Sequence, residues 1–126
     1  MNADTILLRQ AHPAFVQNDL PTSQVFMPNS EDGGLMSAYD GDQISPQDSF
    51  DHYSKVEMRQ SHSVWGLSKM EVDELGVPAE SNPTPNNPAH ALINFSSKPE
   101  SAYRKVAKSL KALAMKRGCQ YLPPPQ

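Results

Sequence analysis

The chain has 126 residues, of which 37% are hydrophobic and 20% are charged, and its formal net charge is −3. A chain of this length forms one domain and buries about two thirds of the surface that its unfolded form exposes, so it supports a single hydrophobic core. The longest early apolar run, residues 6–8, is too short for a signal peptide or a membrane-spanning helix. We therefore expect one domain, residues 1–126, in the cytoplasm.

Cysteine and histidine usage limits the metal and cofactor chemistry. Cys119 is the only cysteine, which excludes an internal disulfide and any zinc site with several cysteine ligands. The four histidines include no closely spaced helical pair, and there is no HExxH motif, phosphate-binding loop or glycine-rich dinucleotide turn. We expect neither a metal site nor a cofactor.

The small net charge hides an asymmetry between two parts of the chain. Residues 1–97 carry a formal charge of −9, whereas residues 98–126 carry +6. A basic end on an acidic body can bind a phosphate backbone, an acidic partner, or the protein's own acidic surface.

The first third of the chain predicts short strands. Residues 4–10, DTILLRQ, predict a buried strand, and residues 12–21 predict a loop because each proline disfavours helix at the residue before it. Residues 23–28, SQVFMP, and residues 35–39, LMSAY, predict two more strands. Asp40 and a glycine then predict a turn, since glycine accepts a positive φ.

A first helix is predicted over about residues 46–56. Ser45 takes the N-cap position, a proline takes the first helical position, and Asp48 lies near the partly positive end of the helix. Phe50 and Tyr53 are three residues apart and are expected on the inward face of this helix.

The middle of the chain alternates short elements with one long loop. Residues 62–67, HSVWGL, have the composition of a central strand. Ser68 and Glu71 have the spacing of a capping box that begins a short second helix. Residues 77–89 contain four prolines and predict an extended loop without regular structure, and residues 90–95, HALINF, predict another strand.

The last helix has the strongest local signal. Ser97 and Glu100 have capping-box spacing, and a helix of about twenty residues then runs to Gly118. Apolar side chains recur at helical spacing along one side, namely Tyr103, Val106, Ala107, Leu110, Leu113 and Ala114. The other side carries Arg104, Lys105, Lys108, Lys111 and Lys116. Residues 119–126 predict an extended tail.

This order of elements predicts an α+β fold. We expect a mainly antiparallel sheet that the first and last helices cover on one face.

The opposed charges, the polar proline-rich loop and the missing catalytic motifs favour a small non-catalytic binding protein, such as an immunity, antitoxin-like or adaptor module. Its partner-binding residues would be the basic residues of the last helix, Arg104, Lys105, Lys108, Lys111 and Lys116. Nucleic acid is a less favoured partner, because no stacking aromatic residues interleave with these cations. The apolar stripe around Leu110 is needed for the core, so we expect no membrane partner.

A small enzyme is the alternative. Its site would combine His12, His62 and His90 with Arg9 and Ser37, which meet only after folding. An arginine on one strand and a serine on another is also part of how some ADP-ribosyltransferase-like folds hold a nicotinamide dinucleotide, although the catalytic glutamate motif has no clear match. The observation that separates the two classes is whether these residues converge in one concave pocket.

Three parts of the chain carry a resemblance to other proteins. They are SAYDGDQISPQDSFDHYS, SVWGLS, and NPAHALINFSS followed by KVAKSLKALAMKRG. Together they resemble a small bacterial protein family with no assigned activity, over most of residues 7–121. The resemblance implies a bacterial cytosolic origin and a compact single domain, and it carries over no mechanism, cofactor or catalytic residue.

Overall fold

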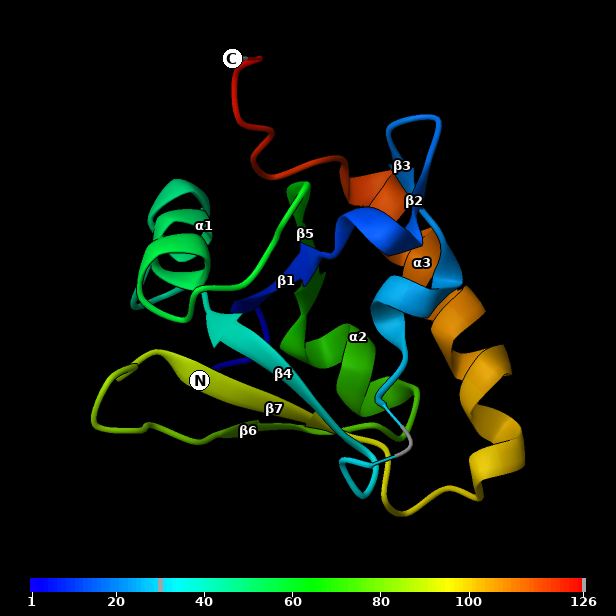
Figure 1. The fold of residues 1–126 in the computed structure, drawn as a ribbon. Coiled ribbons are helices and arrows are strands. Elements are labelled where there is room, and N and C mark those ends of the chain that lie inside the picture. The colour runs from blue at the N-terminus through cyan, green and yellow to red at the C-terminus, as the bar shows by residue number, and fades with distance from the viewer. Residues whose placement is uncertain (30, 126) are drawn as a thin grey trace.

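The computed structural model describes residues 1–29 and 31–125, and it is built around a five-stranded antiparallel sheet (Figure 1). The strands lie in the order β5-β1-β4-β7-β6, with bounds β1 Ile6–Ala11, β4 Leu35–Asp40, β5 Ser63–Ser68, β6 Ala79–Ser81 and β7 His90–Asn94. The helices are α1 Pro46–Lys55, α2 Lys69–Glu74 and α3 Tyr103–Arg117. The predicted α+β fold class is confirmed.

The pairing of β1 with its two neighbours is unequal. With β5, β1 forms pairs at all six of its positions. With β4 it pairs only where Leu7 faces Asp40 and Leu8 faces Tyr39. β4 instead pairs with β7 at five of its six positions. Beyond Leu8, no strand pairing therefore joins β1 to β4, and the next residue along β1 is Arg9.

The sheet separates two hydrophobic clusters. Successive residues of a strand point to opposite faces, and Leu7 and Leu8 belong to different clusters. The larger cluster holds Leu7 with Leu110 of α3, and the smaller one holds Leu8 with Phe50 of α1. The two helices thus pack on opposite faces of the sheet (Figure 1). This differs from the expectation of one covered face, and the reason is that β1 is apolar at consecutive positions.

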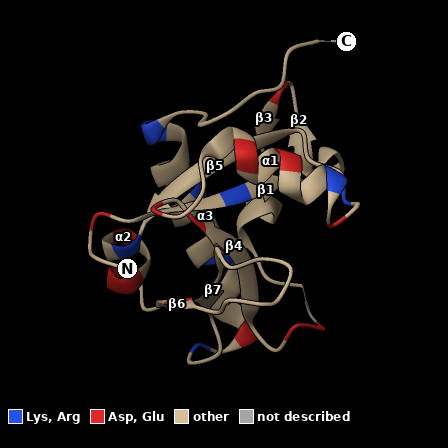
Figure 2. Cartoon of the chain, turned by 90° about the vertical axis from the view of Figure 1, so that its left-hand side faces the viewer, with Lys and Arg blue, Asp and Glu red and all other residues tan. Residues whose placement is uncertain are grey.

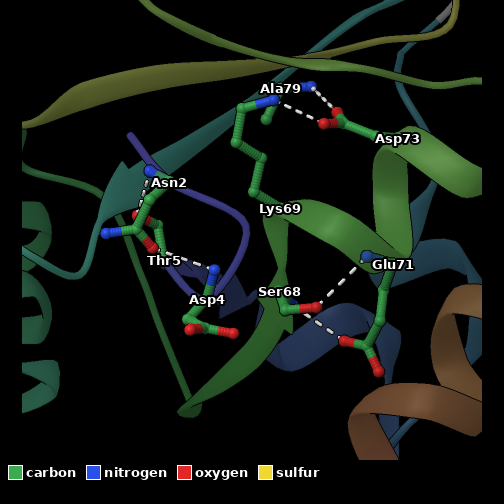
Figure 3. A network of polar contacts seen from close by, with 8 residues as sticks. All are labelled: Asn2, Asp4, Thr5, Ser68, Lys69, Glu71, Asp73 and Ala79. Carbon is green, nitrogen blue, oxygen red and sulfur yellow. Dashed lines mark hydrogen bonds and ion pairs between the residues drawn. The ribbon is translucent and has the colours of Figure 1, made fainter.

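The caps predicted for the first two helices are confirmed. The Ser45 hydroxyl accepts the Asp48 N–H at 3.1 Å and begins α1. At α2, the Ser68 hydroxyl accepts the Glu71 N–H at 3.1 Å, and the Glu71 carboxylate accepts the Ser68 N–H at 2.7 Å (Figure 3). Arg117 Nη1 also lies 2.6 Å from Glu71 Oε1, so this carboxylate ties α2 to the end of α3.

The predicted strand over residues 23–28 is wrong, because residues Ser23–Phe26 form a 3-10 helix. Val25 and Phe26 are both buried in the larger cluster, which also contains the apolar face of α3. A short apolar run such as residues 25–27 does not distinguish a short strand from one helical turn. Packing against α3 decides between the two.

The predicted loop over residues 12–21 contains a short hairpin of β2 Val16–Gln17 and β3 Leu20–Pro21. Asn18 and Asp19 connect the two strands with φ values of 53° and 63°. Two-residue hairpin turns need positive φ at both central positions, which asparagine and aspartate tolerate better than most residues.

The capping box predicted at Ser97 and Glu100 is also wrong. The Ser97 hydroxyl instead donates a 3.4 Å hydrogen bond to the carbonyl of Gly76. A 3-10 turn occupies Glu100–Ala102, and α3 begins only at Tyr103, so that it has 15 residues. Pro99 is extended, with a ψ of 147°, so helical backbone begins only after it.

Both edges of the sheet differ from the sequence prediction. β5 was expected in a central place, yet it is an edge strand that the tail partly covers. The Val64 N–H donates to the Tyr121 carbonyl at 2.9 Å, and the Tyr121 ring lies 5.3 Å from that of Phe50. The opposite edge is β6, which lies inside the segment 77–89 that was expected to have no regular structure.

The packing of α3 yields the first test. Leu110 is 0% exposed, so Leu110→Asp places an unpaired carboxylate in the core. We expect this change to cost several kcal/mol, which is enough to unfold a domain whose total stability is about 5–15 kcal/mol. Leu122→Asp is the control, since Leu122 is 58% exposed. A Leu110→Asp variant that melts at the parent temperature, followed by circular dichroism, would show that α3 is not packed in this way.

The Glu71 carboxylate yields a test by pH. Burial raises the pKa of Glu71, but hydrogen bonds from Arg117 and from the Ser68 N–H outweigh this effect and hold the pKa below its ordinary value. Such a group stabilises the fold above its unfolded pKa of about 4.3, and this stabilisation disappears as the pH falls through the lower folded value.

We expect Glu71→Gln to be less stable than the parent at pH 7 and the difference to shrink as the pH is lowered below about 4. Urea unfolding at a series of pH values measures the difference in free energy of unfolding between the parent and Glu71→Gln. Glu74→Gln is the matched control, because Glu74 is exposed and its replacement should change stability little. A Glu71→Gln difference that stays constant down to pH 2.5 would contradict the electrostatic role.

Candidate functional site

A pocket of about 470 Å³ lies over β4 and β7, beside the end of α1. This volume is within the range of small-ligand sites. We call it the polar pocket, because its lining includes Arg9, Ser37 and His90 together with Asp32, Tyr53, Glu57 and Arg59. The loop before β4, the chain after α1 and the loop before β7 all contribute to its wall.

Arg9 connects three segments at one side of the polar pocket. Its Nε donates to the Val25 carbonyl and its Nη1 to the Ser37 carbonyl, each at 2.8 Å. These bonds join β1 to the 3-10 helix and to β4, at the place where the pairing of β1 and β4 has ended. Burial lowers the pKa of Arg9, while Tyr53 and Asp32 act in the opposite sense. A guanidinium nevertheless stays protonated.

Ser37 and His90 meet across the β4–β7 pair. Ser37 Oγ lies 3.3 Å from His90 Nε2, and His90 Nδ1 lies 2.9 Å from the Asn82 carbonyl. A carbonyl only accepts hydrogen bonds, so the ring proton is on Nδ1 and Nε2 accepts from the serine hydroxyl. A hydroxyl bonded to an oriented imidazole is the arrangement from which nucleophilic serines are built.

A second imidazole supports the wall of the polar pocket. Tyr39 Oη lies 2.9 Å from His52 Nδ1, and His52 Nε2 lies 2.8 Å from the Asn86 carbonyl. The same reasoning places the proton of His52 on Nε2 and makes the tyrosine the donor. Burial, with Glu57 nearby, raises the pKa of Tyr39 well above its usual value and keeps this donor protonated. His52 thus fixes the loop before β7 against α1.

The structure brings together three of the five residues named for an enzyme site. Arg9, Ser37 and His90 line the polar pocket, whereas His12 and His62 lie elsewhere. His12 Nδ1 accepts the N–H of Ala14 at 3.0 Å and caps a short 3-10 helix, Pro13–Phe15. His62 contacts the hydroxyl of the residue after it and an exposed aspartate of the β2–β3 turn.

Several lining residues were not identified from the sequence. Tyr53 was assigned to the inward face of α1, where it does pack, but it also reaches the pocket. Glu57 and Arg59 follow α1 without any motif. Met58 between them has a φ of 56°, an unusual value for a non-glycine residue that sets the direction of the chain at this point. No local sequence pattern predicts such a conformation.

The basic residues of α3 form a separate surface. Arg104, Lys105, Lys108 and Lys116 are exposed, and Lys111 is half-buried. Within the part of the chain that the structure describes, none of these five forms an ion pair. Figure 2 views the molecule from the α1 side and shows acidic residues on that helix. The basic residues of α3 and the acidic residues of α1 therefore lie on opposite sides of the sheet.

The role of Arg9 can be tested by a matched pair of substitutions. Arg9→Lys keeps the charge, but one ammonium group cannot replace the two-pronged contact with the Val25 and Ser37 carbonyls. We expect the free energy of unfolding to fall by about 1–3 kcal/mol, because a partly buried acceptor loses its donor. Arg59→Lys changes an exposed side chain and should alter it by under about 0.5 kcal/mol. If chemical denaturation shows that Arg9→Lys and Arg59→Lys lower the free energy of unfolding equally, the bridging role of Arg9 is contradicted.

For residues 1–29 and 31–125, no cluster of three or more His, Cys, Asp or Glu side chains is placed to hold a metal ion. None of the helices described for these residues is long and apolar enough to cross a membrane. Comparison of the chain with protein-family models, with curated proteins and with solved structures finds no match.

Proposed function

We propose that this protein is a non-catalytic binding module, of the immunity, antitoxin-like or adaptor type, and that the polar pocket is the place where it recognises a protein partner. The convergence of Arg9, Ser37 and His90 in one pocket is what an enzyme site would require. The observation that carries the proposal is instead that Arg9 and His90 are bonded to backbone carbonyls, which holds them as fixed polar groups. Concave sites with a few convergent polar groups above apolar side chains are typical of ligand recognition. Here Leu35 and Leu92 supply apolar surface. A bacterial, cytoplasmic setting is part of this proposal and rests on the sequence resemblance alone.

Features of the Ser37–His90 pair favour recognition over catalysis. Ser37 is in the interior of a regular strand, where it faces Leu92 of β7. The second nitrogen of His90 contacts a peptide carbonyl, which orients the ring but lacks the negative charge that stabilises an imidazolium in catalytic triads. Arg9 already contacts two backbone carbonyls. These groups are therefore arranged to present a fixed polar surface.

The basic surface of α3 is a second contact surface in this proposal. Its exposed cations, led by Lys105 and Lys108, would attract an acidic partner and increase the rate of association. This role would make the association dependent on salt concentration. Nucleic acid is the less favoured partner, and it would produce a steep salt dependence without any requirement for the polar pocket.

The enzyme alternative has a specific observation in its favour. The hydroxyl of Ser37 is bonded to an oriented imidazole, and Glu57 lines the same pocket as Arg9 and Ser37. The presence of Glu57 in the pocket is relevant to an ADP-ribosyltransferase-like site, because such a site requires a glutamate. A fluorophosphonate probe tests the serine directly. We expect no labelling, whereas labelling of Ser37 that His90→Gln abolishes would establish an enzyme.

Partner recovery from bacterial lysate with three bait proteins tests the binding proposal. The baits are the parent, Ser37→Trp, and a Lys105→Gln, Lys108→Gln, Lys111→Gln triple variant. Ser37 is exposed on β4, and tryptophan is favourable in strands, so the first variant should fill the pocket without unfolding the domain. Melting temperatures serve as the control for folding.

We expect the parent to retain a protein partner, Ser37→Trp to lose it, and the triple variant to retain it with a weaker dependence on salt. If the triple variant loses the partner and Ser37→Trp retains it, the recognition site is on α3 and not in the polar pocket. Retention of nucleic acid as the only bound component would contradict protein recognition altogether.

A further inference from the structure

We propose that the polar pocket recognises a carboxylate group and that the guanidinium of Arg9 binds it. This inference rests on the proposed role of the pocket as a recognition site, and it specifies the chemistry of the group that enters.

Arg9 has hydrogen-bonding capacity that the protein does not use. A guanidinium has five N–H donors in a planar fork. Arg9 donates one from Nε to Val25 and one from Nη1 to Ser37, so three N–H groups, including both on Nη2, have no partner among the described residues. No buried side-chain nitrogen or oxygen of those residues lacks a partner, so Nη2 is not buried. Because Arg9 lines the polar pocket, Nη2 is the donor available to a ligand there.

Arg9 also has no carboxylate in direct contact. Among the described residues, no carboxylate forms an ion pair with Arg9, although Asp32 acts on it by its charge. A half-buried cation loses part of its hydration, and it is stabilised when an anion supplies charge-assisted hydrogen bonds. The Arg9 side chain is also held in place by its two carbonyl contacts, so little conformational entropy is lost when a ligand binds.

The charges of the pocket favour a carboxylate over a phosphate. Both fit the fork of a guanidinium. Asp32 and Glu57, however, offset the charges of Arg9 and Arg59 in the same pocket, so no cation there is left to balance a second negative charge on the ligand. A singly charged planar carboxylate suits this mixed environment better than a phosphate dianion. The Ser37 hydroxyl can rotate to add one neutral hydrogen bond.

An NMR titration of the ¹⁵N-labelled full chain tests the inference at constant ionic strength, with sodium chloride as the reference. The probes are sodium propionate, its neutral isostere propionamide, and inorganic phosphate. Two further probes distinguish possible sources of the carboxylate. N-acetyl-glutamate N-methylamide presents an acidic side chain, and N-acetyl-alanine presents a C-terminus. The signals followed are Arg9 Nε–H and the amides of Ser37 and His90.

We expect propionate to shift these signals saturably and to bind at least about tenfold more tightly than propionamide, because hydrogen bonds to a charged acceptor are stronger than neutral ones. Phosphate should bind more weakly than propionate. Tighter binding of N-acetyl-glutamate N-methylamide would identify an acidic side chain as the source of the carboxylate. Tighter binding of N-acetyl-alanine would identify a C-terminus. Equal binding of propionate and propionamide, or tighter binding of phosphate, would overturn the carboxylate assignment.

Two variants distinguish this inference from the proposed function. Ser37→Trp fills the pocket but keeps the Ser37 carbonyl that Arg9 uses, and it should abolish the propionate shifts. Lys108→Gln, on the α3 surface, should leave them unchanged. Propionate shifts that persist in Ser37→Trp would place the anion outside the pocket and overturn the inference. Suppose that propionate and propionamide bind the parent equally well and that neither binds Ser37→Trp. The pocket then remains a recognition site, and only its preference for a carboxylate is wrong.

Discussion

A single half-buried arginine substitutes for strand pairing at the centre of the sheet. β1 and β4 pair at only two positions, and beyond them the guanidinium of Arg9 joins β1 to the Ser37 carbonyl of β4. The same group holds the Val25 carbonyl, and with it the 3-10 helix under α3. A charged side chain takes this place because it donates in two directions, which a backbone N–H cannot do. The consequence is a sheet that stays connected while a pocket opens beside α1.

The remaining walls of the pocket depend on histidines that bond to backbone carbonyls. His52 reaches Asn86, and His90 reaches Asn82, both in the proline-rich loop before β7. Each ring uses its second nitrogen on a hydroxyl, from Tyr39 or from Ser37. Irregular segments leave carbonyls unpaired, and side chains with N–H donors satisfy them. The loop that looks unstructured in the sequence is thereby given one conformation, and of the two histidines that fix it, His90 also lines the site.

The parts of the fold that sequence predicted well are those determined by neighbours in the chain. Ser45 and Ser68 cap helices through bonds that span three residues, and the apolar pair Leu7 and Leu8 marks a strand buried on both faces. The 3-10 helix Ser23–Phe26 was missed because packing against α3 overrides the local pattern. The capping box at Ser97 was wrong because its hydroxyl bonds to a carbonyl that is distant in sequence.

For the site, residue type identified Arg9, Ser37 and His90, but only the register of β4 with β7 brings the last two together. The central claim, that Arg9 is a hydrogen-bonded bridge at this site, is tested most directly by hydrogen exchange at its Nε–H. The account predicts exchange far slower than at Arg104 Nε–H on the exposed side of α3, and close to that of backbone amides in β1. Exchange at Arg9 as fast as at Arg104 would contradict it.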